Sequence, residues 1–315
     1  MKNLQIVFMG TPEFAVETLK EIISENFKVV GVVTAPDRPA GRGRKISVSP
    51  VKEFALEKEI PVLQPTNLKS EEFLSDLKSL QPNLQVVVAF RMLPKIVWQL
   101  PEYGTFNLHA SLLPQYRGAA PINWALINGE KITGISTFFI DEKIDTGEMI
   151  LQKEVSISEE ENAGKLHHKL MKEGAKLVVH TLNEIQKGAV KTLLQPEIPF
   201  PKEAPKLNSE NTKIDWNQSP TEIYNKIRGL SPYPGAWCFL QNGTDQLRCK
   251  IFKARTASEN RHLSVGKIFL SGKELHIALK KGSIIVEEIQ LPGKRKMKVN
   301  ELLNGFIFKE NAHMA

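Results

Sequence analysis

The chain has 315 residues, of which 41% are hydrophobic and 24% are charged, and a formal net charge of +7. This length exceeds what one core usually organises, so we expect one large domain or two of unequal size. The composition is ordinary for a globular enzyme. No apolar run approaches the roughly 20 residues that a membrane helix needs, so we expect no membrane partner.

The start of the chain and its two cysteines predict a cytoplasmic location. The segment MKNLQIVFMGTPEF contains a short apolar run without a small-residue cleavage site, which is typical of a first strand rather than a signal peptide. Cys238 and Cys249 are too few for a disulfide framework, and they lack the four-ligand spacing of a zinc site. We therefore expect reduced thiols and no metal.

The positive charge lies mainly in the last third of the chain. From Lys206 onward there are 18 Lys and Arg against 10 Asp and Glu, a balance of +8; the residues before it balance to −1 (24 minus 25). A near-neutral N-terminal part and a basic C-terminal part favour a polyanionic partner for the C-terminal part. Charge alone fits a role in solubility equally well.

Apolar segments and helical patterns alternate along the first part of the chain. The predicted strands are Leu4–Met9, Lys28–Thr34, Val62–Leu63, Leu84–Phe90 and Thr105–His109, and the helical patterns cover residues 13–26, 50–59, 69–80 and 93–100. This alternation predicts a parallel α/β sheet covered on both faces. In such sheets ligands bind beyond the carboxyl ends of the strands.

The turn after the first strand, Gly10-Thr11-Pro12, does not have the G-x-G-x-x-G pattern that binds dinucleotides. A nicotinamide-dependent enzyme is therefore disfavoured despite the fold class. We expect Gly10 to serve the backbone geometry of the turn.

The second half of the chain changes character after a long helical pattern. Two strands, Ile132–Ile140 and Glu148–Val155, precede this helix of about residues 163–187, and four prolines in residues 191–206 predict an extended linker. A helix over Pro220–Leu230 follows. The hairpin signals Asn242-Gly243, Ser271-Gly272 and Lys281-Gly282 then predict a small β-barrel. We expect an α/β domain over 1–190, the linker over 191–206 and a barrel domain over 207–315.

Three polar side chains form the main candidate catalytic set. Asn107 and His109 lie two apart at the end of a predicted strand, so they point to the same face, and Asp145 lies in the polar turn DEKIDTGEM. An amide can donate to a developing oxyanion, and a histidine oriented by a carboxylate can move a proton near neutral pH. Each residue alone fits a structural role in capping a loop; together they favour catalysis.

The loop Thr34–Ser49 is the main candidate for binding phosphate. It is much longer than the roughly 2–6 residues usual between a strand and a helix, and it follows the carboxyl end of a strand. A basic flexible loop in that place can clamp a phosphate backbone. An ordinary surface loop would have the same composition. Its basic residues are Arg38, Arg42, Arg44 and Lys45.

The segment FNLHASLLPQYRGAAPINWAL resembles the signature of folate-dependent formyltransferases. In that family Asn-x-His begins the motif, Ser-Leu-Leu-Pro follows, and an aspartate lies downstream in an Asp-Thr-Gly turn. This chain matches at each of those positions. Four further stretches, MGTPEFAV, TAPDRPAGRGRK, Asp215-Trp216 and SPYPGAW, are similar to the family members that act on a charged tRNA. The likeness runs from end to end.

The resemblance implies a Rossmann-like catalytic domain followed by an OB-fold-like barrel that helps to hold tRNA. It implies 10-formyltetrahydrofolate as the formyl donor, initiator methionyl-tRNA as the acceptor, and catalysis by Asn107, His109 and Asp145. The reaction needs no metal, and we expect a monomer, although the sequence does not establish the oligomeric state. Ser111, Leu112, Leu113 and Pro114 would border the folate pocket. The loop containing Arg42 would reach the acceptor end of the tRNA.

The sequence departs from the family pattern in one place and leaves three competing functions open. Phe90-Arg91-Met92-Leu93 stands where many relatives carry a tyrosine-glycine pair, and this run is expected to line the pterin pocket. A formyltransferase acting on an amino sugar nucleotide or a purine-pathway amine could share the catalytic set but does not need the basic loop. A hydrolase could release formate from the same folate. An RNA-binding protein without catalytic activity could share the fold and the basic charge.

Overall fold

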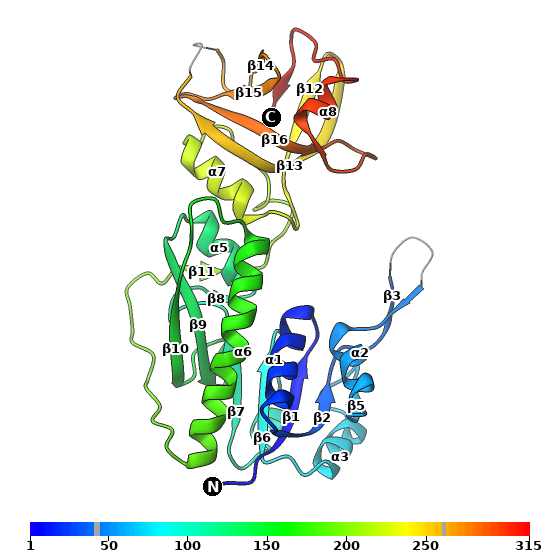
Figure 1. The fold of residues 1–315 in the computed structure, drawn as a ribbon, viewed down its shortest axis with the longest axis vertical. Coiled ribbons are helices and arrows are strands. Elements are labelled where there is room, and N and C mark those ends of the chain that lie inside the picture. Colours follow the sequence, from blue (N-terminus) through cyan, green and yellow to red (C-terminus); the bar gives the residue numbers. More distant parts are fainter. Residues whose placement is uncertain (41–44, 260–262) are drawn as a thin grey trace. The chain divides into compact units, whose positions relative to one another are not determined.

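The structure, a computed structural model, describes residues 1–40, 45–259 and 263–315 (Figure 1). The chain folds into two compact units, each assembled from separate segments. Unit 1 contains Met1–Gly118, Ile132–Ser156 and His167–Glu203, and unit 2 contains Ala119–Lys131, Ile157–Leu166 and Ala204–Ala315. The domains expected from the sequence, 1–190 and 207–315 with a linker between them, stay a prediction.

Unit 1 is an α/β layer structure around one seven-stranded sheet, whose order is β10-β9-β7-β6-β1-β2-β5. Its strands are β1 (Gln5–Gly10), β2 (Lys28–Val33), β5 (Val62–Leu63), β6 (Leu84–Val88), β7 (Thr105–His109), β9 (Ile132–Phe139) and β10 (Met149–Ser156). Its helices are α1 (Glu13–Ser24), α2 (Pro50–Glu57), α3 (Glu71–Ser79) and α4 (Lys95–Trp98), with α6 (Ala163–Lys187).

The predicted parallel sheet is confirmed for five of these strands, because β5, β2, β1, β6 and β7 pair in parallel. The hairpin of β9 and β10 adds an antiparallel edge beside β7. Central strands are buried on both faces and therefore carry apolar residues at nearly every position. In β1 the side chains of Ile6, Val7, Phe8 and Met9 are all fully buried.

In unit 1, helix α4 is shorter than the sequence predicts, and Gly10 has the expected role. The helix expected over residues 93–100 covers only Lys95–Trp98, since Pro94 precedes it and Pro101 lies shortly beyond it. Gly10 does serve backbone geometry. A Cβ at this position would lie 2.6 Å from the Ala15 Cβ and 3.0 Å from the Val88 carbonyl oxygen, so only glycine lets the strand turn closely into α1.

The expected long loop contains a small hairpin of β3 (Arg38–Ala40) and β4 (Lys45–Ser47), which extends outward from unit 1 (Figure 1). Two short strands, β8 (Arg117–Gly118) and β11 (Glu203–Ala204), form a separate pair. These pieces lie around the carboxyl ends of the sheet strands, where the sequence predicts the site.

Unit 2 is an antiparallel barrel with helices beside it, and its sheet has the order β14-β15-β16-β13-β12-β18 with β17 paired to β16. The strands are β12 (Ala236–Asn242), β13 (Asp245–Ala257), β14 (Ile268–Ser271), β15 (Glu274–Ala278), β16 (Ser283–Gln290), β17 (Met297–Lys298) and β18 (His313–Met314); the helices are α5 (Pro121–Ile127), α7 (Pro220–Gly229) and α8 (Val299–Leu303). A bridge between Lys267 and His313 joins the two ends of the sheet. The predicted barrel is confirmed.

Helix α5 belongs to unit 2 because it packs on α7. The Asn123 side chain donates a hydrogen bond of 2.7 Å to the Gly229 carbonyl, and a Cβ at Gly229 would lie 2.8 Å from Ile127 Cγ1. A capping box of Ser219 and Glu222 begins α7. Helices α5 and α7, whose contacting residues lie more than 100 positions apart, therefore form one packed pair. No local pattern in the sequence indicates this.

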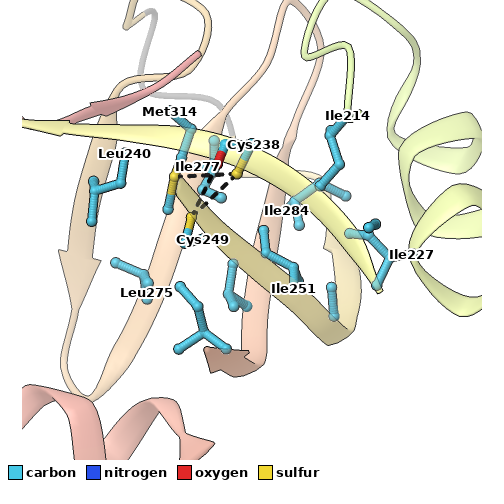
Figure 2. Close-up of a cluster of buried hydrophobic side chains, with 14 of the residues drawn as sticks. Ile214, Ile227, Cys238, Leu240, Cys249, Ile251, Leu275, Ile277, Ile284 and Met314 are labelled. Atoms are coloured by element: carbon cyan, nitrogen blue, oxygen red, sulfur yellow. Dashed lines mark hydrogen bonds between the residues drawn. The ribbon is translucent and has the colours of Figure 1, made fainter. Parts of the chain in front are cut away.

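The barrel core is apolar and contains both cysteines (Figure 2). Cys238 on β12 and Cys249 on β13 face each other as free thiols with their sulfur atoms 3.4 Å apart, and the Met314 sulfur lies 3.7 Å from that of Cys238. The hydrogen bond with Cys249 and the complete burial raise the pKa of the Cys238 thiol well above its usual value. The thiol therefore stays protonated and acts as core packing.

Among the residues that the structure describes, no helix is both long and apolar enough to cross a membrane.

Candidate active site

The end of β7 presents Asn107 and His109 on one face of the sheet, as predicted from the alternation of side chains along a strand. Between them Leu108 points the other way, where it packs against Gly174 of α6. Asn107 is half-buried, and within the described part of the chain no hydrogen bond engages its side-chain amide. This amide can therefore donate to a bound molecule.

His109 is buried and lies between two oxygen atoms of the protein. Its Nε2 is 2.8 Å from the Tyr116 carbonyl oxygen, and its Nδ1 is 3.7 Å from Asp145 Oδ2. A carbonyl oxygen only accepts hydrogen bonds, so Nε2 carries a proton. The distance to Asp145 fits an ion pair and is too long for a hydrogen bond. The imidazolium form thus has an oxygen facing each of its two N–H groups.

Asp145 is held in a conformation that few residues adopt. Its φ is +56°, in the left-handed region, and its Oδ2 accepts a hydrogen bond of 2.9 Å from the Gly118 backbone N–H. The same turn needs a glycine at position 147, because a Cβ there would lie 1.7 Å from the Phe139 carbonyl oxygen. Backbone strain of this kind is common at functional sites and persists only where the surroundings fix it.

The segment Ser111–Pro114 is tied down by hydrogen bonds from the antiparallel edge of the sheet. Ser136 Oγ donates to the Ser111 carbonyl at 2.7 Å, and Gln152 Nε2 donates to the Leu113 carbonyl at 3.0 Å. Ser111, Leu113 and Pro114 are buried, and Leu112 lies against Gly134. The segment forms a rigid wall beside His109, and its contact with folate stays a prediction.

A cavity of about 820 Å³ follows the carboxyl ends of β5 and β6. It is lined by residues 66–69 and 91–96, which combine apolar side chains such as Met92 and Leu93 with the cations Lys69, Arg91 and Lys95. Arg91 holds the two sides together by donating to the Pro65 and Thr66 carbonyl oxygens. The sequence singled out the run at 90–93, and most of that run lines this cavity.

The basic loop is anchored at its base. The Thr34 and Ser49 hydroxyls, at its two ends, lie 2.8 Å apart, and Asp37 accepts hydrogen bonds from Lys52 at 2.5 Å and Gln64 at 2.8 Å. These hydrogen bonds, that from Lys52 first, lower the pKa of the Asp37 carboxyl.

Two of the four predicted phosphate-binding residues lie within the described part of the loop. Arg38 is exposed in β3, and Lys45 lies in β4. Arg42 and Arg44 lie outside the described residues. Binding of tRNA by all four stays a prediction.

Sequence reasoning missed the residues that support the catalytic set. Tyr116 and Gly118 offer only backbone groups, and Ser136, Gln152 and Gln195 lie in other segments of the chain. The register of β7 against β9, which sets His109 opposite Ser136, would have identified Ser136. No local pattern identifies the others.

Comparison with known proteins identifies the family of the chain. Residues 3–182 match the family described as formyl transferase, and residues 206–307 match the formyl transferase C-terminal domain. The chain belongs to the formyl transferase family. It is 57% identical over 312 residues to the methionyl-tRNA formyltransferase of Flavobacterium johnsoniae, covering 99% of both chains, and 50% identical over 314 residues to that of Bacteroides fragilis, covering 98% and 97%.

Solved structures at lower identity share the fold. The sugar 3N-formyltransferase WlaRD superposes with a TM-score of 0.66 at 20% identity, covering 94% of this chain and all of that one. HypX from Aquifex aeolicus in complex with tetrahydrofolic acid gives a TM-score of 0.62 at 18% identity, covering 96% of this chain and 47% of that one. These likenesses support the two-part formyltransferase architecture.

Proposed function

We propose that the chain transfers the formyl group of 10-formyltetrahydrofolate to the free α-amino group of initiator methionyl-tRNA, for translation initiation. The observation that carries this proposal is the meeting of His109 and Asp145 beside the Asn107 amide, which no described residue engages, in a chain 57% identical over 312 residues to a methionyl-tRNA formyltransferase. The reaction moves a one-carbon acyl group between two nitrogen atoms.

Asn107 stabilises the negative charge that develops on the formyl oxygen. Its side-chain N–H group is half-buried, without a competing partner among the described residues, and held on a strand of the sheet. A fixed donor in such a place is already oriented toward the developing charge, which is the main source of catalysis in acyl transfer. Removing one such donor typically costs about 100- to 1000-fold in turnover.

His109 and Asp145 handle the protons of the reaction. The attacking α-amine belongs to an amino acid ester, and its pKa lies below the roughly 7.7–8.0 of a free α-amino group, so a useful fraction is neutral and nucleophilic. The attack leaves an ammonium proton to remove, and the leaving nitrogen must gain a proton. Because the Tyr116 carbonyl holds Nε2–H, the nitrogen that can pass protons between these groups is Nδ1, which has the Asp145 carboxylate 3.7 Å away.

The cavity beside β5 and β6 fits the folate. Its volume of about 820 Å³ suits a drug-sized ligand. The apolar side chains of Leu68, Met92 and Leu93 would lie against the flat pterin and benzoyl rings, and Lys69 would face the glutamate carboxylates. The ammonium of Lys95 is already paired with Glu142. 10-Formyltetrahydrofolate supplies the formyl carbon when it is bound.

The tRNA would contact the basic hairpin loop and the basic barrel. The balance of +8 from Lys206 onward and the cations Arg38, Arg42, Arg44 and Lys45 supply charge for phosphate contacts. The nearest competing function is formyl transfer to a sugar nucleotide, as in WlaRD, and this basic character disfavours it. We further propose that the protein acts as a monomer in the cytoplasm.

The deciding experiment measures transfer of labelled formyl from 10-formyltetrahydrofolate to three acceptors: initiator methionyl-tRNA, elongator methionyl-tRNA and an amino sugar nucleotide. We expect rapid transfer to the initiator alone. Transfer to the sugar nucleotide alone would overturn the proposal. Release of labelled formate without an acceptor would instead identify a hydrolase.

A further inference from the structure

Gln195 lies in the proline-rich segment that the sequence describes as a linker, yet its side chain reaches the candidate catalytic turn. Its Nε2 donates to the Asp145 carbonyl at 2.9 Å and to the Gly147 carbonyl at 2.8 Å. Its Oε1 accepts from Arg117 Nη2 at 2.6 Å and Nε at 3.2 Å. Every hydrogen-bonding group of the amide is therefore used.

The backbone of this segment is also paired with the site. Leu193 and Met149 exchange two backbone hydrogen bonds, of 2.8 and 3.0 Å, just after the catalytic turn. Both residues of the contact belong to unit 1, so the pairing lies within one compact unit. The segment that leads away from α6 thus adds a short extra strand-like edge beside β10.

We propose that Gln195 is a positioning residue that holds Asp145 against His109. Asp145 has a φ of +56°, in the left-handed region that costs energy for residues other than glycine and persists only where the surroundings fix it. The Gln195 amide fixes the carbonyls of Asp145 and Gly147, on both sides of Thr146. This fixes the direction in which the Asp145 carboxylate leaves the backbone.

The Gln195 amide also connects the Asp145 turn to Gly118, whose backbone N–H donates to the Asp145 carboxylate. Gly118, whose N–H bonds Asp145 Oδ2, directly follows Arg117, whose guanidinium binds Gln195 Oε1. The hydrogen bonds close a ring through Gln195, Asp145, Gly118 and Arg117. Asp145 is therefore held at its carbonyl and at its carboxylate by groups that are themselves joined.

Only a side chain with both a donor amide and an acceptor oxygen satisfies this arrangement. Glutamate keeps an acceptor for Arg117 but has no donor for the two carbonyls when it is ionised. Q195E is therefore the sharpest variant, since it preserves size and the Arg117 contact. The matched control is E197Q, which makes the reverse chemical change at an exposed position of the same segment.

The inference rests on the proposed function, and the test separates the two. In the formyl transfer assay we expect Q195E to lower kcat about 10- to 100-fold, the effect of slightly misplacing a catalytic group, with KM for the folate and for the tRNA changed less than about threefold. E197Q should match the wild type. If Q195E does not fold, Q195M, which keeps the length but removes both polar functions, replaces it.

A double-mutant cycle shows whether Gln195 acts through Asp145. Once D145N has removed the carboxylate, adding Q195E should cost little more, because contacting residues in one network are not additive. Equal kcat values for Q195E, Q195M and the wild type would overturn the inference while leaving the function intact. Fully additive losses would also overturn it. A wild-type protein that formylates no tRNA would instead overturn the proposed function.

Discussion

His109 at the end of β7 and Cys238 in the barrel are both buried side chains that can exchange a proton, but their surroundings differ. His109 lies among oxygen atoms, with the Tyr116 carbonyl at 2.8 Å and the Asp145 carboxylate at 3.7 Å. Cys238 lies among sulfur and carbon atoms, with Cys249 at 3.4 Å and Met314 at 3.7 Å.

The difference shows that burial has a different effect on a side chain among polar groups than on one among apolar groups. The Tyr116 carbonyl accepts a hydrogen bond from the His109 ring, whereas the hydrogen bond with Cys249 and burial in the apolar core raise the pKa of the Cys238 thiol well above its usual value. The oxygen atoms around His109 come from two different connections: Tyr116 follows β7 along the chain, and Asp145 lies between the antiparallel strands β9 and β10. The barrel core is filled by strand residues that face each other, and the described side chains beside the cysteines there are apolar (Figure 2).

The largest expected effect comes from removing the amide beside His109. Asn107→Ala should lower kcat by at least about 100-fold, because one oxyanion donor is lost, while equilibrium binding of 10-formyltetrahydrofolate changes little. Steady-state kinetics and a folate titration measure the two quantities. Asn304→Ala, at an exposed position in unit 2, is the matched control and should keep the wild-type kcat. Turnover near normal in Asn107→Ala would show that the β7 end does not carry the chemistry.

A smaller effect, confined to one substrate, is expected in the basic loop. Arg42→Ala should raise KM for methionyl-tRNA several-fold and leave KM for the folate unchanged, because it removes one phosphate contact. The slope of log KM against log salt concentration should fall by about 1. Equal changes in the two KM values would mean that the loop shapes the folate pocket instead.

The smallest effect on catalysis is expected in the barrel core. Cys238→Ser should lower the free energy of unfolding by about 1–3 kcal/mol, because the buried hydroxyl meets only weak sulfur acceptors. Denaturant titration measures this loss, and kcat of the folded protein at low temperature should stay within about twofold of the wild type. Unchanged stability would contradict the description of this cluster as a closed, apolar core.

Sequence patterns predict the features of this protein that are determined by residues close together in the sequence. The strand and helix alternation, the barrel turns and the shared face of Asn107 and His109 all follow from local periodicity. The proximity of Asp145 to His109 was expected from the family motif. Helix α4 is shorter than expected because prolines on both sides outweigh its apolar pattern.

Contacts between distant segments could not be predicted in this way. Gln195 lies 50 residues after Asp145, in a proline-rich stretch whose composition indicates a linker. Asn123 bonds Gly229 across 106 residues. Such contacts depend on which ends of strands and helices come together in the folded chain. No local pattern in a single sequence indicates this.

The central claim is that the carboxylate at position 145 acts with His109 on the formyl group. Its most direct test is the single-turnover rate of formyl transfer from 10-formyltetrahydrofolate to initiator methionyl-tRNA, measured with both substrates saturating for the wild type and for D145N. We expect a rate at least about 100-fold lower in D145N, within the range that acid–base groups contribute, with both substrates still bound. A D145N rate equal to that of the wild type would contradict it.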